Sequence, residues 1–214
     1  MDNHVHGDYD QTSKNQGPSA PCWSCRSLVD GRVPFCHDCG VVQPPKVSDD
    51  FRRLGLTPTF NIDPKDLERR YFAFQRTFHP DRFATKSARE KQYSLQHATN
   101  LNQAYARLKT PIKRAEVLLE TKGVTPADEA VTTSDPELLM EAMESREALD
   151  AAEKDDKLLE LERLARTDIE LSEEAMSVAF QAVDFAGVAI LINRMKYLVK
   201  LLEEIRQKRR QFSA

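Results

Sequence analysis

The chain is patterned for helices from about residue 49 onward. Its first clear apolar stripe repeats at i, i+4, i+7 and i+11, the spacing of one helix face. Asp63 and Pro64 precede the stripe as an N-cap and a first-turn proline, and Pro80 disfavours helical geometry in the residue before it. We therefore predict a helix that begins near residue 64 and ends at Phe78 or His79. Its apolar face consists of Leu67, Tyr71, Phe74 and Phe78.

A second helix is expected after a loop from His79 to about Ser87. Its apolar residues repeat at i, i+3, i+4 and i+7, and it should end near Leu108. Two helices of similar length joined by a short loop form an antiparallel hairpin. Thr110-Pro111 then begins a further helix, which Gly123 ends. The face of the second helix consists of Leu101, Ala104, Tyr105 and Leu108.

The last third of the chain should consist of long helices, because after Pro136 it has no proline and a single glycine, Gly187. The pattern predicts helices near 135–153, 155–182 and 184–210, packed as a bundle. The basic last turn, with Arg206, Lys208, Arg209 and Arg210, suits a helix C-terminus and is expected to need no partner. Most of the following should be core: Leu158, Leu161, Leu164, Ile169, Leu171, Val178, Ile190, Leu191 and Leu198.

All four cysteines lie in one short segment, as two Cys-x-x-Cys pairs separated by ten residues. Two such pairs let four thiolates converge on one zinc ion, and four sulfurs close the coordination shell, so the zinc would be structural. Two disulfides are the alternative, but they require an oxidising compartment. His37, inside the second pair, is expected to be a surface residue. The expected zinc ligands are Cys22, Cys25, Cys36 and Cys39.

The charge of the chain argues against a nucleic-acid-binding role for this four-cysteine module. The 214 residues carry 31 Lys and Arg against 34 Asp and Glu, a net charge of −3. Residues 1–50 have four basic against seven acidic side chains, which argues against binding to nucleic acid phosphates. No run of 18 apolar residues exists, so no membrane span is predicted.

The N-terminal residues 1–20 are polar and lack the apolar clusters that offset the cost of ordering, so we expect a disordered tail. They also lack the apolar stretch of a secretory signal and the Arg-rich composition of a transit peptide. These features favour a bacterial cytoplasm, with the mitochondrial matrix as the alternative if the N-terminus has been trimmed. The fold class is all-α with a zinc-ribbon-like N-terminal module.

Three segments together resemble a J-domain. They are a short helix with Phe51-Arg52-Arg53-Leu54-Gly55-Leu56, a basic helix that ends in Phe78-His79-Pro80-Asp81-Arg82-Phe83, and a helix with Leu101-Asn102-Gln103-Ala104-Tyr105. The His-Pro-Asp tripeptide alone is a weak signal. Its place between two helices of the right length, after arginines, makes the resemblance specific.

The resemblance extends to the HscB family, the dedicated iron–sulfur cluster co-chaperones. It rests on Arg114–Leu119, on Leu138–Leu149 and on the final helix with Met195–Leu201, and it covers about three-quarters of the chain, from Asp49 to about Gln211. Some members of that family also carry a four-cysteine N-terminal module. The chain departs from the family pattern at Arg53, usually apolar, and at Val117, often a tyrosine.

The resemblance implies two binding surfaces. A DnaK-type chaperone, usually the specialised HscA or its mitochondrial counterpart, would be bound by His79, Pro80, Asp81, Arg69, Arg70 and Arg76. The scaffold protein IscU would be bound by Leu139, Met140, Met143, Glu144, Glu147 and Tyr197. By periodicity alone, the stripe of Leu139, Met140, Met143 and Glu147 would be read as bundle core.

The resemblance also implies that the protein stimulates ATP hydrolysis in its partner and catalyses nothing itself. His79 and Asp81 have no evident Ser or Cys nucleophile near them in sequence, and no Gly-rich phosphate loop exists. Two other functions stay open: a general J-protein that delivers unfolded clients to DnaK, and a zinc-dependent adaptor. The expected domains are a tail (1–20), a four-Cys zinc module (21–45), a J-domain (49–123) and a C-terminal helical IscU-binding domain (134–212).

Overall fold

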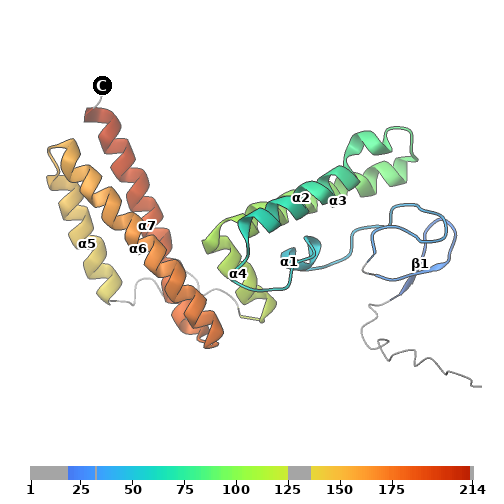
Figure 1. Ribbon diagram of the computed structural model, residues 1–214, viewed down its shortest axis with the longest axis horizontal. Coiled ribbons are helices and arrows are strands. Elements are labelled where there is room, and N and C mark those ends of the chain that lie inside the picture. The colour runs from blue at the N-terminus through green and yellow to red at the C-terminus, as the bar shows by residue number, and fades with distance from the viewer. Residues whose placement is uncertain (1–18, 32, 125–135, 213–214) are drawn as a thin grey trace, which may run out of the picture. The chain divides into compact units, whose positions relative to one another are not determined.

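The computed structural model describes residues 19–31, 33–124 and 136–212 (Figure 1). These residues form seven α-helices, a 3₁₀ helix and two short strands, which confirms the predicted all-α class. None of the helices in the described ranges is long and apolar enough to cross a membrane. In chain order the elements are β1 (Ala20–Pro21), β2 (Leu28–Val29), α1 (Asp50–Arg53), α2 (Pro64–Phe78), η1 (Pro80–Phe83), α3 (Ala88–Lys109), α4 (Pro111–Thr121), α5 (Pro136–Ala151), α6 (Asp155–Gln181) and α7 (Phe185–Phe212).

The chain divides into two compact units, and helices α2 and α3 contribute to both. One unit combines the described part of Met1–Ser48 with Ala73–Leu101. The other combines Asp49–Phe72 with the described part of Asn102–Ala214. The N-terminal module therefore belongs with the end of the helical hairpin that carries the His-Pro-Asp loop.

The N-terminal module is built from strands of two residues and tight turns. β1 pairs antiparallel with β2, with Ala20 opposite Val29, and an isolated bridge joins Phe35 to Val42. The predicted tail of residues 1–20 is therefore too long, because Ala20 pairs through its backbone with β2. Residues 1–18 of that tail lie outside the described residues.

The predicted boundaries of the hairpin are confirmed. α2 begins at Pro64, where the Lys65 amide donates to Asp63 Oδ1 at 2.9 Å, and it ends at Phe78 before Pro80. The predicted loop from His79 to Ser87 contains one element that the pattern did not predict, the 3₁₀ helix η1. Buried Ser94 donates from its hydroxyl to the Phe78 carbonyl at 2.8 Å, which joins α3 to the end of α2.

The other end of the hairpin is held by aromatic and charged side chains. Tyr71 of α2 stacks on Tyr105 of α3 with ring centroids 4.1 Å apart. Arg107 of α3 donates to Asp50 of α1 at 2.9 Å and to Glu120 of α4 at 2.7 Å. These contacts fasten both short flanking helices to the hairpin.

The base of the hairpin also contacts the C-terminal helices within the second unit. Phe60 stacks on Phe180 of α6 with ring centroids 5.4 Å apart, and Asn61 Nδ2 donates to Ser177 Oγ at 2.6 Å. On α4, Glu116 forms an ion pair with Lys196 of α7 at 2.7 Å.

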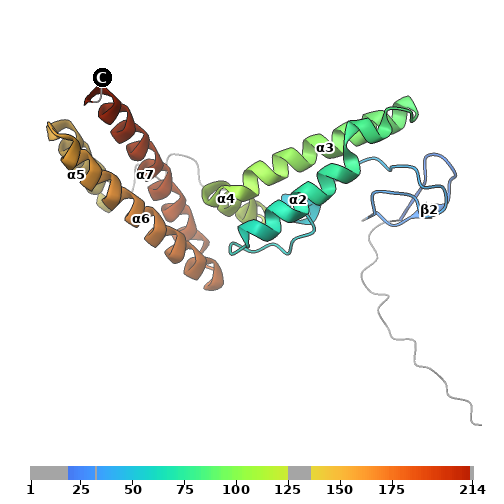
Figure 2. The ribbon, with the colours of Figure 1, turned by 45° about the horizontal axis from the view of Figure 1, so that its top comes forward.

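Helices α5, α6 and α7 form the predicted three-helix bundle and lie side by side in both views (Figures 1 and 2). Of the nine apolar residues expected there, five are buried or half-buried, and four are exposed. α6 has two apolar stripes that repeat about every seven residues, and only the stripe with Leu158 and Ala165 faces the other helices. The exposed four are Leu164 (45% exposed), Leu171 (57%), Val178 (64%) and Ile190 (42%).

The basic end of α7 has partners, contrary to the sequence-based expectation. Lys208 Nζ donates to the carbonyl oxygens of Leu149 and Asp150 at 2.6 and 3.0 Å, so it caps the end of α5. Arg209 donates to Asp155 and Glu162 of α6, each at 2.8 Å. These side chains therefore connect α7 to α5 and α6, and their role is not limited to a favourable interaction with the α7 helix dipole.

Candidate functional site

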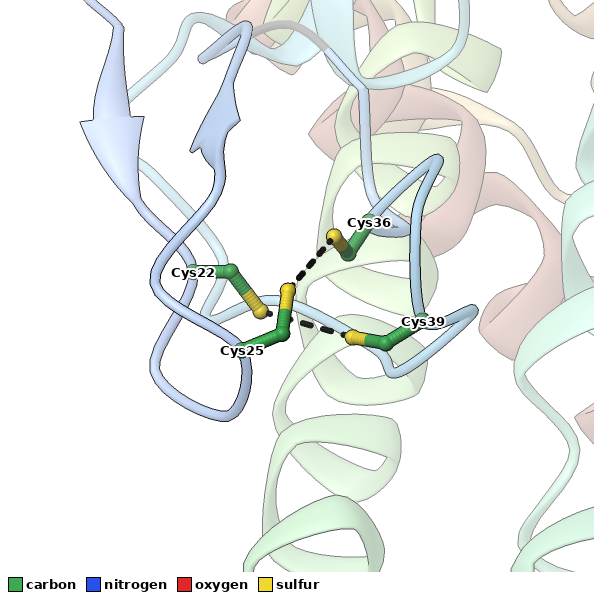
Figure 3. A group of neighbouring side chains, drawn as sticks. All are labelled: Cys22, Cys25, Cys36 and Cys39. Atoms are coloured by element: carbon green, nitrogen blue, oxygen red, sulfur yellow. Dashed lines mark hydrogen bonds between the residues drawn. The ribbon is translucent and has the colours of Figure 1, made fainter.

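The four cysteines converge from two turns of the N-terminal module (Figure 3). Their Sγ atoms all lie within 4.8 Å of one another, with Cys22 3.7 Å from Cys39 and Cys25 3.6 Å from Cys36. These separations are far longer than a disulfide bond of about 2.05 Å, so no disulfide joins the four residues. They are close to the roughly 3.8 Å between sulfurs that share a tetrahedral ion at about 2.3 Å. The donor set therefore fits a metal ion.

The electrostatics of the cluster also favour a bound cation. Burial raises the pKa of the Cys22 thiol, but hydrogen bonds from the Cys25 and Ser24 amides and from Gln43 outweigh it and lower the pKa to about 6. For Cys39 a hydrogen bond from the Val41 amide lowers the pKa, yet burial and the three neighbouring sulfurs raise it to about 12. Four thiolates this close together need a positive ion between them.

The His-Pro-Asp loop is exposed, and buried aromatic residues anchor it on both sides. Phe78 and Phe83 are 2% and 6% exposed, whereas the side chains of His79 and Asp81 are 53% and 90% exposed. His79 is the N-cap of η1, and its Nδ1 accepts from the Asp81 amide at 3.3 Å. Pro80 opens η1 and fixes its own backbone φ. The tripeptide is thus presented to solvent in a defined turn.

The predicted basic residues of α2 have different surroundings. Arg76 is exposed beside the loop, where its backbone carbonyl accepts from Arg82 at 3.4 Å. Arg69 is exposed and pairs with Asp66. Arg70 is half-buried and donates to Asp66 at 2.7 Å and to the Gly55 carbonyl at 2.7 Å, so part of its role is to hold the end of α1. These contacts hold the pKa of the Asp66 carboxyl below its usual range.

The predicted scaffold-binding residues of α5 lie on its outer face. Leu139, Met140 and Met143 are 53%, 62% and 58% exposed, so they are not bundle core. At 100° per residue they span about 100° of the helix circumference. Glu147 is exposed within the same sector, and Glu144 is exposed about 40° beyond it.

Tyr197 of α7 lies against α5 and is half-buried. Its hydroxyl donates to the Ala142 carbonyl at 3.2 Å, and its ring packs on the buried cluster of the bundle. Burial raises the pKa of the Tyr197 phenol, and Ser145 opposes this through a hydrogen bond. The structure therefore brings Tyr197 to the helix that carries the other five predicted residues.

Two residues around these sites were missed by the sequence analysis. Gln43 is buried and donates from Nε2 to Cys22 Sγ at 3.3 Å, outside either Cys-x-x-Cys pair. Ser94 supports the loop through the Phe78 carbonyl. No signal in a single sequence distinguishes either side chain from an ordinary polar residue.

Comparison with known proteins gives the family. A protein-family model described as the HSCB C-terminal oligomerisation domain matches residues 134–206. The iron–sulfur cluster co-chaperone protein HscB of Mus musculus is 32% identical over 189 residues, which cover 86% of this chain and 81% of the mouse protein. The co-chaperone protein HscB homolog of Pseudoalteromonas atlantica is 41% identical over 162 residues, covering 72% of this chain and 93% of that protein.

Solved structures agree with the sequence relatives. The crystal structure of the human co-chaperone protein HscB superposes with a TM-score of 0.81 and 30% identity, covering 88% of this chain and 98% of the human one. HscB from Vibrio cholerae gives a TM-score of 0.69 at 30% identity, covering 77% of this chain and 99% of that one. Proteins so named are co-chaperones, a class that is not enzymatic, as the sequence predicted. The chain belongs to the HscB family of iron–sulfur cluster co-chaperones.

Proposed function

We propose that this chain binds an IscU-type scaffold protein through α5 and stimulates ATP hydrolysis by an HscA/DnaK-type chaperone through its His-Pro-Asp loop. A structural zinc ion would be held by Cys22, Cys25, Cys36 and Cys39. One observation carries the proposal: each of the two sets expected from the resemblance to HscB has exposed members, His79 and Asp81 on the loop and Met140 and Met143 on α5.

The chaperone side is supported by the chemistry of the loop. Pro80 limits the backbone, so less entropy is lost when the loop is bound. The exposed Asp81 carboxylate can accept two hydrogen bonds from a partner arginine. Exposed Arg69 and Arg76 are suited to attract an acidic surface, which raises the association rate more than the affinity.

The scaffold side is supported by an apolar patch with a polar edge. Leu139, Met140 and Met143 remain more than half exposed on α5, although each would be favoured inside a core. Methionine adapts its shape to a partner surface. Glu144 and Glu147 would provide the polar rim of such an interface.

The choice of zinc among metal ions rests on the donors. Four thiolates in a closed tetrahedral arrangement are typical of structural zinc sites. Bound there, zinc would cross-link the two Cys-x-x-Cys turns. It would have no open coordination position and so no catalytic role.

The test of the chaperone side is the steady-state ATPase rate of an HscA-type chaperone, with and without the scaffold protein. We expect stimulation that increases when the scaffold is present and that is lost in His79→Gln. Thr85→Ala, an exposed substitution in the same loop, is the matched control and should stimulate normally. Stimulation that persists in His79→Gln would contradict the proposal. ATPase stimulation that does not change when the scaffold is added would indicate a general J-protein. No ATPase stimulation by the unaltered chain would favour the zinc-dependent adaptor.

The scaffold side has a separate test in direct binding. Leu139→Ala should raise the Kd for the scaffold about tenfold, because it removes an apolar anchor. Leu171→Ala is the matched control, since Leu171 is exposed to a similar extent on a different helix of the bundle, 57% against 53%. Equal losses in the two variants, or no loss in Leu139→Ala, would rule out α5 as the binding surface.

A further inference from the structure

The four-cysteine module is packed on the end of the helical hairpin that carries the His-Pro-Asp loop. The first compact unit consists of the described part of Met1–Ser48 together with Ala73–Leu101, a segment that includes the end of α2, η1 and the start of α3. The module and the loop therefore belong to one packed body, and the contacts between them can be followed residue by residue.

The first contact begins inside the first Cys-x-x-Cys pair. Trp23 follows Cys22 directly, and its indole Nε1 donates to the Val42 carbonyl at 2.8 Å. Its ring makes a T-shaped contact with Tyr93 of α3, with centroids 6.2 Å apart, and the Arg89 guanidinium lies 5.1 Å from the Trp23 ring centroid. Aromatic and cation–π contacts of this kind fix one cysteine turn on α3.

The second contact begins beside the other cysteine pair. Phe35, which precedes Cys36, stacks on Phe78 with centroids 5.6 Å apart and an angle of 3° between the rings. Phe78 in turn stacks on His97 of α3 at 4.3 Å. Because Phe78 precedes His79 directly, this stack holds the residue that adjoins the His-Pro-Asp loop.

The third contact runs through a buried glutamine. Gln43 Nε2 donates to Cys22 Sγ at 3.3 Å and to the Val41 carbonyl at 3.1 Å. The backbone carbonyl oxygen of Gln43 lies 2.9 Å from His97 Nε2. Since a carbonyl only accepts, His97 donates from that nitrogen. A continuous path thus leads from a metal ligand through Gln43 and His97 to Phe78.

We infer that the module is a metal-dependent brace for the His-Pro-Asp loop: a filled four-cysteine site holds Phe35, Trp23 and Gln43 against the hairpin, and an empty one releases them. The module's buried cluster contains Cys22, Val29 and Cys36, two of which are the expected ligands, so its own apolar core is small. That loop binds the chaperone only if the proposed function holds, but the brace itself does not depend on it.

The first measurement is amide hydrogen exchange of the full chain with zinc bound and after treatment with a zinc chelator. Removal of zinc should speed exchange at His79–Lys86 and at Arg89–His97 at least about fivefold, because those segments lose packed neighbours. Exchange in α6 and α7 should not change. Emission of Trp23, the single tryptophan of the chain, should shift to longer wavelength at the same time. Unchanged exchange at both segments would overturn the inference.

Two substitutions separate the brace from the metal. Phe35→Ala keeps all four cysteines, so it should retain zinc, measured by release to a colorimetric chelator, yet show the faster exchange of the zinc-free protein at the loop. Leu28→Ala is the matched control, because Leu28 is an apolar residue of the same module that is 68% exposed. It should match the unaltered chain. A Phe35→Ala variant with bound zinc and unchanged exchange would also overturn the inference.

The chaperone assay distinguishes this inference from the proposed function. We expect Phe35→Ala to need several times more protein than the unaltered chain for half-maximal ATPase stimulation, whereas His79→Gln should give no stimulation at any concentration. If His79→Gln loses stimulation but Phe35→Ala with zinc matches the unaltered chain, the function stands and the brace has no effect on it. If exchange changes as expected but His79→Gln still stimulates, the brace stands and the proposed function fails.

Discussion

The N-terminal module and the C-terminal bundle are held together by different forces. The buried cluster of the module has three residues, Cys22, Val29 and Cys36, whereas the bundle has a cluster of eight that includes Leu158, Leu201 and Ile205. Apolar burial contributes about 25 cal/mol per Å², so a cluster of three supplies little, and the proposed metal ion would supply most of the remaining stabilisation. The bundle needs no ion, because its long helices bury enough apolar surface. Each region should therefore fail under a perturbation that leaves the other intact.

Loss of a ligand should have the largest effect, and only on the module. Cys36→Ser leaves three sulfurs, and since structural zinc supplies on the order of 10 kcal/mol to small modules, we expect the module to unfold. Zinc content should fall and Trp23 emission should shift to longer wavelength, while the far-UV circular dichroism of the helices should change little. A Cys36→Ser protein that keeps its zinc and its emission would show that the module has a sufficient core of its own.

A cavity in the bundle should have the next largest effect, and it should destabilise the bundle while leaving the N-terminal module intact. Ile205 is 0% exposed in the bundle cluster, and Ile205→Ala should lower the free energy of unfolding by about 3 kcal/mol. Urea unfolding followed by circular dichroism measures this loss. Zinc content should stay at that of the unaltered chain; a loss of zinc in this variant would mean that the two regions do not fail separately.

The smallest effect is expected at the end of α5. Lys208→Met keeps the side-chain stem but removes the donor to the Leu149 and Asp150 carbonyls, which should lower the free energy of unfolding by about 1 kcal/mol. Lys200→Met, at an exposed position of the same helix, is the control and should change it by less than about 0.5 kcal/mol. Equal values for the two variants would mean that the cap adds nothing to the bundle.

The same contrast explains what could be predicted from the sequence. The helix boundaries could be predicted because Asp63-Pro64, Pro80 and Gly123 act on the backbone locally. The cysteine cluster could be predicted because the Cys-x-x-Cys spacing lets the four sulfurs converge on one point. The exposure of Leu171 could not be predicted, because α6 has two apolar stripes and only tertiary packing selects the one that is buried. The exposure of Met140 was expected from family resemblance and not from periodicity.

Polar contacts between residues far apart in the chain also could not be predicted from the sequence. Lys208 and Arg209 looked like the ordinary basic end of a helix, and their partners on α5 and α6 lie about fifty residues away or more in the chain. Gln43 gave no sign of its contact with Cys22. Such contacts depend on how elements meet, which local patterns do not encode.

The concentration of every cysteine of the chain in one module has a practical consequence. Thiols bound to a metal react slowly with alkylating reagents, and free ones react readily. Because the chain has four cysteines and all of them belong to this cluster, one quarter of the thiols that a maleimide labels would equal the number of empty sites in a preparation. A purified sample therefore carries its own assay of metal loading, without any engineered probe.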